Sequence, residues 1–206
     1  MASDAMVMWL VRAGDSVWQQ EHRLQGRADL PLSPQGRAMI MSDVAQRHVS
    51  AADRVATVHH APDEGAAESA AIVAGALGAK PRPSDDLADP DLGLLGGLTI
   101  ALFEERFPTR FRQWEDDPLS LVPPEGEPLA AARERVLREV ARLARRTRGR
   151  ALGLVLHPMA LGFVRCALAG RPPGDLWRVL DGRPRLERYL LPADAGDRME
   201  AAVGGQ

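Results

Sequence analysis

The sequence predicts an α/β fold, a three-layer α/β/α sandwich around a mostly parallel central sheet. Short apolar segments with the composition of buried strands recur along the chain, and helical segments separate them. Strands that alternate with helices favour parallel pairing, with helices on both faces of the sheet. The 206 residues, 45% of them apolar, suffice for one compact core, so we expect a single domain over residues 1–206.

The expected strands are short apolar runs. The first, MVMWLV, is continuous rather than alternating, which is typical of a strand buried on both faces. The last carries a partly alternating pattern. The expected strands are Met6–Val11, Val55–Val58 and Leu152–Leu156, closed by Trp177–Leu180 and Leu186–Leu191.

The expected helices follow from caps and periodicity. Ser33 and Pro34 form an N-cap with proline at the first helical position, and Gly78 ends an alanine-rich segment. A cap-like segment is expected at about residues 98–128, and a frayed tail at 193–206. The expected helices are Pro34 to about His48, Pro62–Leu77, one or two over Leu98–Trp114 with a break near Pro108, the amphipathic Leu129–Arg146, and Met159–Leu168.

Charge and composition argue against several classes of function. The net charge of −2 is not the basic charge expected of a protein that binds nucleic acids or acidic membrane surfaces. A single cysteine, Cys166, excludes an internal disulfide. The apolar stretch Ala151–Gly170 is interrupted by His157-Pro158, which favours two short elements over a membrane span. We expect a soluble cytoplasmic protein without a signal peptide, cofactor or bound metal.

Polar residues follow three of the expected strands. Arg12 follows the first, His59 and His60 follow the second, and His157 follows the third. Because ligands of such folds bind at the carboxyl ends of the strands, Arg12 and His157 are candidates for a phosphate or carboxylate site, with Asp89 as a proton donor. By themselves these residues are equally compatible with a solvated arginine and structural histidines.

Motifs along most of the chain add a resemblance. The segment Leu10–Trp18 (LVRAGDSVW) resembles the first motif of the histidine phosphatase superfamily, in its phosphoglycerate mutase-like branch, where Arg-His-Gly precedes an acidic residue and Ser or Thr. The resemblance spans roughly Val7–Ala169 and implies the fold of that family. Further ordered matches are Arg23, Gln25-Gly26, Asp29, Pro31-Leu32-Ser33, Gly36, Phe107-Pro108, Pro123–Glu127, Arg135-Val136 and Leu154–His157.

The resemblance implies phosphatase or phosphoglycerate mutase chemistry. In this family a histidine of the first motif attacks phosphorus, two arginines and a second histidine hold the phosphoryl oxygens, and an acidic residue protonates the leaving group. Here Arg12 matches the first arginine and His157 the second histidine, while Asp89 takes the place of the acidic residue, usually a glutamate.

Other family positions differ in this chain. Ala13 stands where the family has its nucleophilic histidine, and Gly65 stands where it has the second arginine, beside the acidic Asp63 and Glu64. Pro158 replaces the glycine after the second histidine. Loss of a nucleophile that acts as part of a unit costs roughly a million-fold in turnover, so the phosphohistidine route is not expected here.

Three explanations remain open at this stage. In the first, the protein is a natural pseudoenzyme with a binding, scaffolding or regulatory role, and its partner is a small anionic or phosphorylated ligand or another protein. In the second, it is a phosphohydrolase of small phosphate esters with a site rewired around His157, His60 and Asp89, with or without a metal. In the third, Ala13 was engineered. We favour the first, because several positions differ independently. The candidate catalytic residues are His157 and Asp89, and the candidate ligand-binding residues are Arg12, His157, Arg23, Gln19, His60 and Glu127.

Overall fold

The computed structural model describes residues 5–47, 55–147, 151–182, 184–192 and 194–204. Its centre is a five-stranded sheet in the order β3-β2-β4-β1-β5. The pairs β1–β4, β2–β4 and β2–β3 are parallel, whereas β5 runs antiparallel to β1. The strands are β1 (Met6–Arg12), β2 (Val55–His60), β3 (Lys80–Pro83), β4 (Ala151–Leu156) and β5 (Leu186–Leu191).

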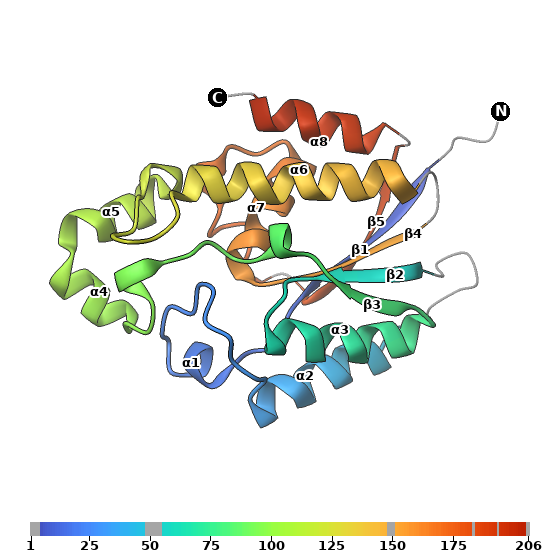
Figure 1. Ribbon diagram of the computed structural model, residues 1–206, viewed down its shortest axis with the longest axis horizontal. Coiled ribbons are helices and arrows are strands. Elements are labelled where there is room, and N and C mark those ends of the chain that lie inside the picture. The colour runs from blue at the N-terminus through green and yellow to red at the C-terminus, as the bar shows by residue number, and fades with distance from the viewer. Residues whose placement is uncertain (1–4, 48–54, 148–150, 183, 193, 205–206) are drawn as a thin grey trace.

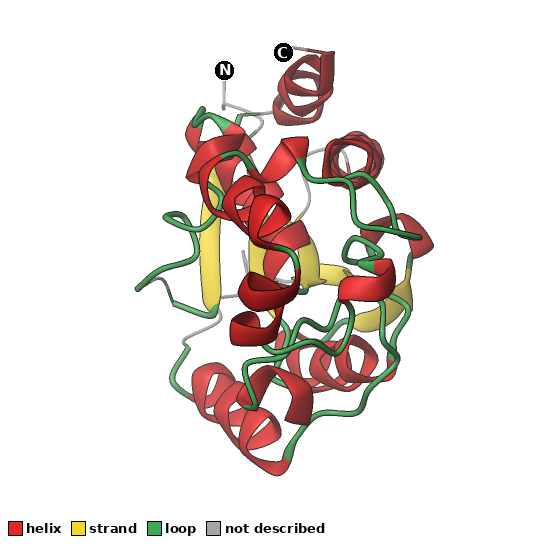
Figure 2. Cartoon of the chain, turned by 90° about the vertical axis from the view of Figure 1, so that its left-hand side faces the viewer, coloured by secondary structure: helices red, strands yellow, loops and turns green. Residues whose placement is uncertain are grey.

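Helices cover both faces of this sheet. The view of Figure 1 places α6 and α8 on one side of the strands and α2 and α3 on the other, and Figure 2 shows the strands between these two groups. The three-layer α/β/α prediction is therefore confirmed. The helices are α1 (Val17–Gln20), α2 (Pro34–Ala45), α3 (Glu64–Leu77), α4 (Ile100–Arg106), α5 (Pro108–Asp116), α6 (Leu129–Thr147), α7 (Pro158–Ala169) and α8 (Ala195–Gly204).

Two apolar cores lie on the two faces of the sheet. Alternate residues of β1 enter opposite cores: Met8 and Leu10 pack with α6 and α7, whereas Trp9 and Val11 pack with α2 and α3. All four are buried, which explains why β1 is a continuous apolar run without alternation. A third core, built around Phe103, joins α4 and α5 to α6 and α7 beyond the edge of the sheet.

Local signals place several boundaries correctly. The side chain of Ser33 accepts a hydrogen bond from the Gly36 amide at 2.9 Å and caps α2, with Pro34 at its first position. Gly78 ends α3 with φ +64°, a left-handed conformation that glycine adopts without strain. The break between α4 and α5 falls at Pro108. The predicted end of α2 near His48 lies outside the described residues, and the helix itself ends at Ala45.

Three expectations need correction. The segment Trp177–Leu180 forms turns rather than a strand, because the preceding Pro172, Pro173 and Gly174 start a 3-10 turn and the Trp177 ring packs 4.4 Å from Trp114. Strand β3 was not expected, since its two prolines are tolerated only at a sheet edge.

The third correction concerns the tail. Residues 195–204 form helix α8, whose Ala195 and Met199 are buried against α6 and α7. Packing of this apolar face stabilises the helix, although the small and polar residues of the segment predict a frayed tail. Residues 193, 205 and 206 lie outside the described part of the chain. Among the described helices, none is both long enough and apolar enough to cross a bilayer.

Candidate active site

The carboxyl ends of the three central strands meet at one edge of the sheet. Arg12 ends β1, His60 ends β2, and His157 follows β4 as the N-cap of α7. The register pairs Arg12 with Leu156, and the amide of Ala13 donates to the Leu156 carbonyl at 2.9 Å. Parallel pairing therefore brings the first motif beside His157, as expected for a ligand edge in this fold.

His157 forms a buried pair with Asp63. Its Nε2 lies 2.9 Å from Asp63 Oδ1, and the two side chains are 3% and 10% exposed. The same Asp63 oxygen accepts the Ala66 amide at 2.9 Å and so caps α3. One carboxylate thus ties the start of α3 to the end of β4.

The pair favours its charged form. Burial lowers the pKa of His157 and raises that of Asp63, but the hydrogen bond and mutual attraction outweigh burial in both groups. The pKa of His157 consequently lies above its ordinary value and that of Asp63 below. An imidazolium with Nε2 bound to Asp63 still carries an N–H at Nδ1.

Two buried donors at this edge lack a partner. Neither His157 Nδ1 nor Arg12 Nε has a hydrogen-bond partner among the described residues. A buried donor left unpaired costs about 1–3 kcal/mol. Both residues end or follow neighbouring strands, Arg12 in β1 and His157 after β4, so the two donors lie at the same edge of the sheet.

One terminal nitrogen of this arginine, Nη2, binds a carboxylate that a second arginine also binds. Arg12 binds Asp15 at 3.0 Å, and Asp15 also accepts from Arg185 at 2.6 Å. Arg185 further donates to the carbonyl of Ala13 at 3.2 Å. The loop after β1 is therefore held by two arginines around a single carboxylate, which offsets part of their positive charge.

Asp89 approaches the same edge from the loop before α4. It is 5% exposed, and its carboxylate accepts the Ala160 amide at 2.7 Å near the start of α7. Burial raises the pKa of Asp89 although the charge of His157 and the helix amides oppose this. A carboxyl group with a raised pKa is suited to donating a proton.

The backbone around the first and second motifs is tightly packed. Ala13 is 1% exposed, and its methyl group offers no nucleophilic atom. A Cβ built on Gly65 would lie 2.8 Å from the Leu30 carbonyl oxygen, closer than real Cβ contacts come. Any side chain at position 65 therefore requires the backbone near Leu30 to move.

A cleft of about 210 Å³ lies at this edge of the sheet, beside Arg12 and Asp89. Of the residues that the sequence predicts for the site, Arg12, Gln19, Arg23 and Asp89 line the cleft. His157 is buried and is not among the lining residues. Its other lining residues are largely apolar. They are His22, Leu24, Gln25, Gly26, Leu92, Ile100, Trp114, Pro158, Met159 and Trp177.

The structure places the remaining two candidates outside the lining of the cleft. His60 lies with Nδ1 2.7 Å from the Ala61 carbonyl, and burial lowers its pKa. Glu127 is bound by Arg135 at 2.8 and 2.9 Å and by Arg27 at 2.9 Å. Within the described residues, no group of three or more His, Cys, Asp or Glu side chains is arranged to hold a metal.

Asp63 and Arg185 are contributors that the sequence does not single out as part of the site. An aspartate before an alanine-rich helix is an N-cap signal, but no local pattern indicates its bond to a histidine 94 positions away. Arg185 lies beyond the recognisable motifs, and its contact with Asp15 spans 170 positions. Tertiary packing alone brings both to the site.

Comparison with known proteins agrees with this fold. The family model described as the histidine phosphatase superfamily (branch 1) matches residues 8–182. Phosphoserine phosphatase 1 of Hydrogenobacter thermophilus is 24% identical over 171 residues, which cover 82% of this chain and 78% of that protein. A probable phosphoglycerate mutase, GpmB, of Citrobacter koseri is 28% identical over 172 residues, which cover 80% and 75%.

Solved structures share the fold. YhfR of Bacillus stearothermophilus superposes with a TM-score of 0.75 at 26% identity, over 84% of each chain. The vanadate complex of mycobacterial glucosyl-3-phosphoglycerate phosphatase superposes with a TM-score of 0.72 at 22% identity, over 91% of this chain and 97% of that one.

Proposed function

Since the chain belongs to branch 1 of the histidine phosphatase superfamily, we propose that it is a member without phosphohistidine chemistry whose cleft binds a small anionic or phosphorylated molecule. Its homologues include phosphatases and mutases, so a phosphorylated ligand is the natural class. Arg12 and His157 hold the anionic group, and Gln19 and Arg23 contact the ligand at the mouth.

The argument against the family's covalent step rests on positions 13 and 65. By the resemblance, Ala13 occupies the place of the nucleophile and Gly65 that of the second phosphate-binding arginine. The close approach of the Leu30 carbonyl oxygen to Gly65 indicates that the backbone here is adapted to glycine. Asp63 also engages His157 Nε2, so this nitrogen does not donate to a phosphoryl oxygen and only Nδ1 faces no protein partner among the described residues.

The observation that carries the binding proposal is the pair of unpartnered donors. Arg12 Nε and His157 Nδ1 are both buried and both lack a partner among the described residues, although burial without one is costly. A ligand oxygen accepting from both would remove that cost. Asp63 needs no ligand partner, because its carboxylate is already paired with His157.

The apolar lining suggests the rest of the ligand. Trp114 and Trp177 stack at 4.4 Å, and both line the cleft together with Ile100 and Leu92. A flat apolar body lying against these side chains would place its anionic group toward Arg12. An aryl phosphate has this shape and therefore serves as the probe.

The test follows phenyl phosphate by NMR, with the ring signals of His157 as reporter and release of inorganic phosphate as the measure of turnover. We expect the His157 signals to shift without release of phosphate. Arg12→Gln should weaken binding about tenfold or more, since a charge-assisted hydrogen bond is lost. The matched control Arg110→Gln removes an exposed arginine of α5 and should leave affinity unchanged.

A second candidate is a rewired phosphohydrolase, and the raised pKa of Asp89 in the lining of the cleft favours it. In that case water attacks phosphorus in place of the missing histidine and Asp89 protonates the leaving oxygen. Hydrolysis of phenyl phosphate, with or without divalent metals, that disappears in both His157→Ala and Asp89→Asn would establish this candidate and refute the first. Neither binding nor turnover, with a stable assembly in solution, would instead indicate a scaffolding role.

A further inference from the structure

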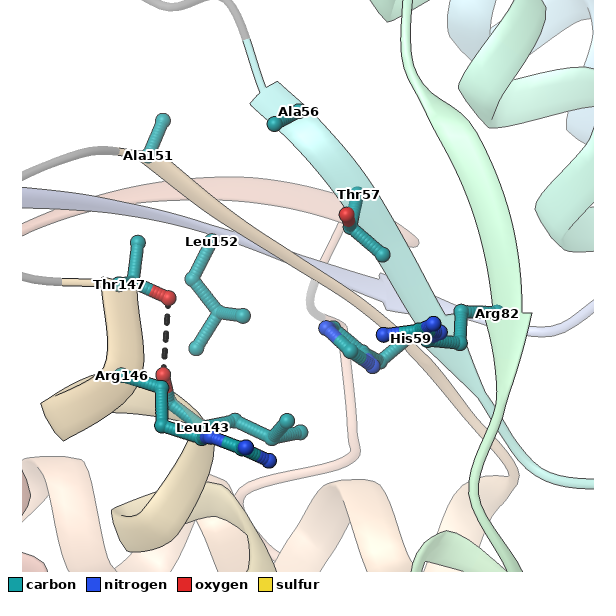
Figure 3. A pocket seen from close by; sticks show the side chains of 9 residues that line it. All are labelled: Ala56, Thr57, His59, Arg82, Leu143, Arg146, Thr147, Ala151 and Leu152. Atoms are coloured by element: carbon teal, nitrogen blue, oxygen red, sulfur yellow. Dashed lines mark hydrogen bonds between the residues drawn. The ribbon is translucent and has the colours of Figure 1, made fainter.

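A second cavity, of about 520 Å³, lies away from the cleft on the face of the sheet that α6 covers. It is bounded by the first part of β2, the start of β4, strand β3 and the last turns of α6. We call it the cationic hollow (Figure 3). Its lining residues are Ala56, Thr57, His59, Arg82, Leu143, Arg146, Thr147, Ala151 and Leu152.

Basic side chains approach the hollow from two sides. His59 and Arg82 are register partners in the parallel pair β2–β3, so their side chains project from the same face of the sheet. Arg146 comes from the end of α6. Figure 3 shows His59 and Arg82 on one side of the hollow and the Arg146 guanidinium on the other.

Within the part of the chain that the structure describes, the side chains of Arg82 and Arg146 make no hydrogen bond or ion pair. Four other arginines of α6 are paired with a carboxylate. These pairs are Arg135–Glu127, Arg138–Glu134, Arg142–Glu139 and Arg145–Glu200.

The carboxylate that acts on His59 is already engaged. Glu139 accepts from Arg142 at 2.6 Å twice and from Ser84 at 2.7 Å. The pKa of His59 is lowered by burial and by the neighbouring Arg82 and Arg142, against the opposing charge of Glu139. Among the described lining residues the two arginines therefore carry a positive charge that no lining carboxylate neutralises.

We propose that the cationic hollow binds a small organic phosphate. Guanidinium groups bind phosphate oxygens through paired N–H donors, which suits Arg82 and Arg146 facing one ligand from two sides. Leu143, Leu152 and Ala151 provide an apolar wall for the organic part. The volume lies within the range of ordinary small-molecule sites. This site is independent of the cleft at Arg12.

Phenyl phosphate at an ionic strength of about 0.15 M tests the proposal, with the ring signals of His59 as reporter. We expect them to shift on titration and the pKa of His59 to rise in the complex. The double variant Arg82→Gln/Arg146→Gln should weaken this binding about tenfold or more. The control Arg110→Gln/Arg112→Gln removes the same charge from an exposed part of α5 and should change affinity less than about twofold.

Three results would overturn the proposal. His59 ring signals that do not shift on titration with phenyl phosphate would show that the hollow does not bind it. Equal weakening in the control double variant would show only diffuse attraction to a positive surface. Loss of the His59 response in Arg12→Gln would assign the response to the cleft. Because His157 reports the cleft and His59 the hollow in the same titration, failure at one site is separable from failure at the other.

Discussion

The β1–β4 side and the α3 side of the candidate site differ in how their polar groups are paired. On the β1–β4 side, Arg12 and His157 are positioned by the register of two buried parallel strands, and each keeps a donor without a protein partner. On the α3 side, Asp63 satisfies both the helix amides and His157 Nε2, and Gly65 packs against the Leu30 carbonyl. One side therefore keeps open donors, whereas the other supplies its own anion.

This difference predicts on which side of the site a substitution should cost more stability. A strand end inside a central sheet is fixed by long-range pairing, so its side chains keep their direction when neighbours change. The start of a helix can accept an aspartate as cap with little rearrangement. If Asp63 acts as a resident counter-charge for His157, changes on the α3 side should have the larger effects.

The largest effect is expected for Asp63→Ala. Removing one partner of a buried ion pair leaves a charge without compensation, which costs about 3–5 kcal/mol of unfolding free energy. Urea denaturation measures this loss. The control Asp63→Asn keeps a side-chain cap and a hydrogen bond to His157, so it should lose clearly less. Equal losses in the two variants would show that the charge of Asp63 is unimportant.

A smaller effect is expected at Gly65. Gly65→Ala places a Cβ 2.8 Å from the Leu30 carbonyl oxygen and should lower the unfolding free energy by about 1–3 kcal/mol. Gly75 lies on the same helix with nothing within 4 Å of its Cβ position. Gly75→Ala should therefore stabilise the protein by up to about 1 kcal/mol. If Gly65→Ala leaves the unfolding free energy unchanged, the backbone near Leu30 accommodates a side chain at position 65 without strain.

The smallest effect is expected in the pH dependence of stability. The folded pKa of His157 lies above its ordinary 6.5, so its stabilisation is complete below pH 6.5 and is lost as pH rises through the folded pKa. The folded pKa of Asp63 lies below 3.8, so its stabilisation is present above pH 3.8 and is lost as pH falls through the folded pKa. The pair thus stabilises most between these two pH values.

Urea denaturation from pH 5 to about pH 9 measures this dependence. The unfolding free energy of the native protein should fall above pH 6.5 more steeply than that of Asp63→Asn. His59 and His60 have lowered pKa values and so affect stability below pH 6.5 instead. Asp89, whose raised pKa also makes stability fall with pH, is present in both proteins, and the charge of Asp63 adds to that rise in the native protein. Parallel curves for the two proteins would contradict an ionised Asp63–His157 pair.

Most of the fold follows from local pattern. Apolar runs, the Ser33-Pro34 cap and the glycine at position 78 are signals within a few residues, so strands β1 and β4 and helices α2, α3 and α6 are predictable. The sequence misses elements whose stability comes from elsewhere. Strand β3 depends on pairing with β2, and α8 depends on its contact with α6 and α7.

For the site, local patterns along the chain predict which residue types lie at the ends of the strands: Arg12, Ala13 and His157 at one ligand edge, with Asp89 on a nearby loop. The partners of these residues depend on the tertiary structure. The pairing of Asp63 with His157 and of Arg185 with Asp15, and the position of the cationic hollow, join residues distant in the chain. The physical reason is that strand and cap preferences act over a few residues, whereas hydrogen bonds and burial depend on which distant segments the packed core brings into contact.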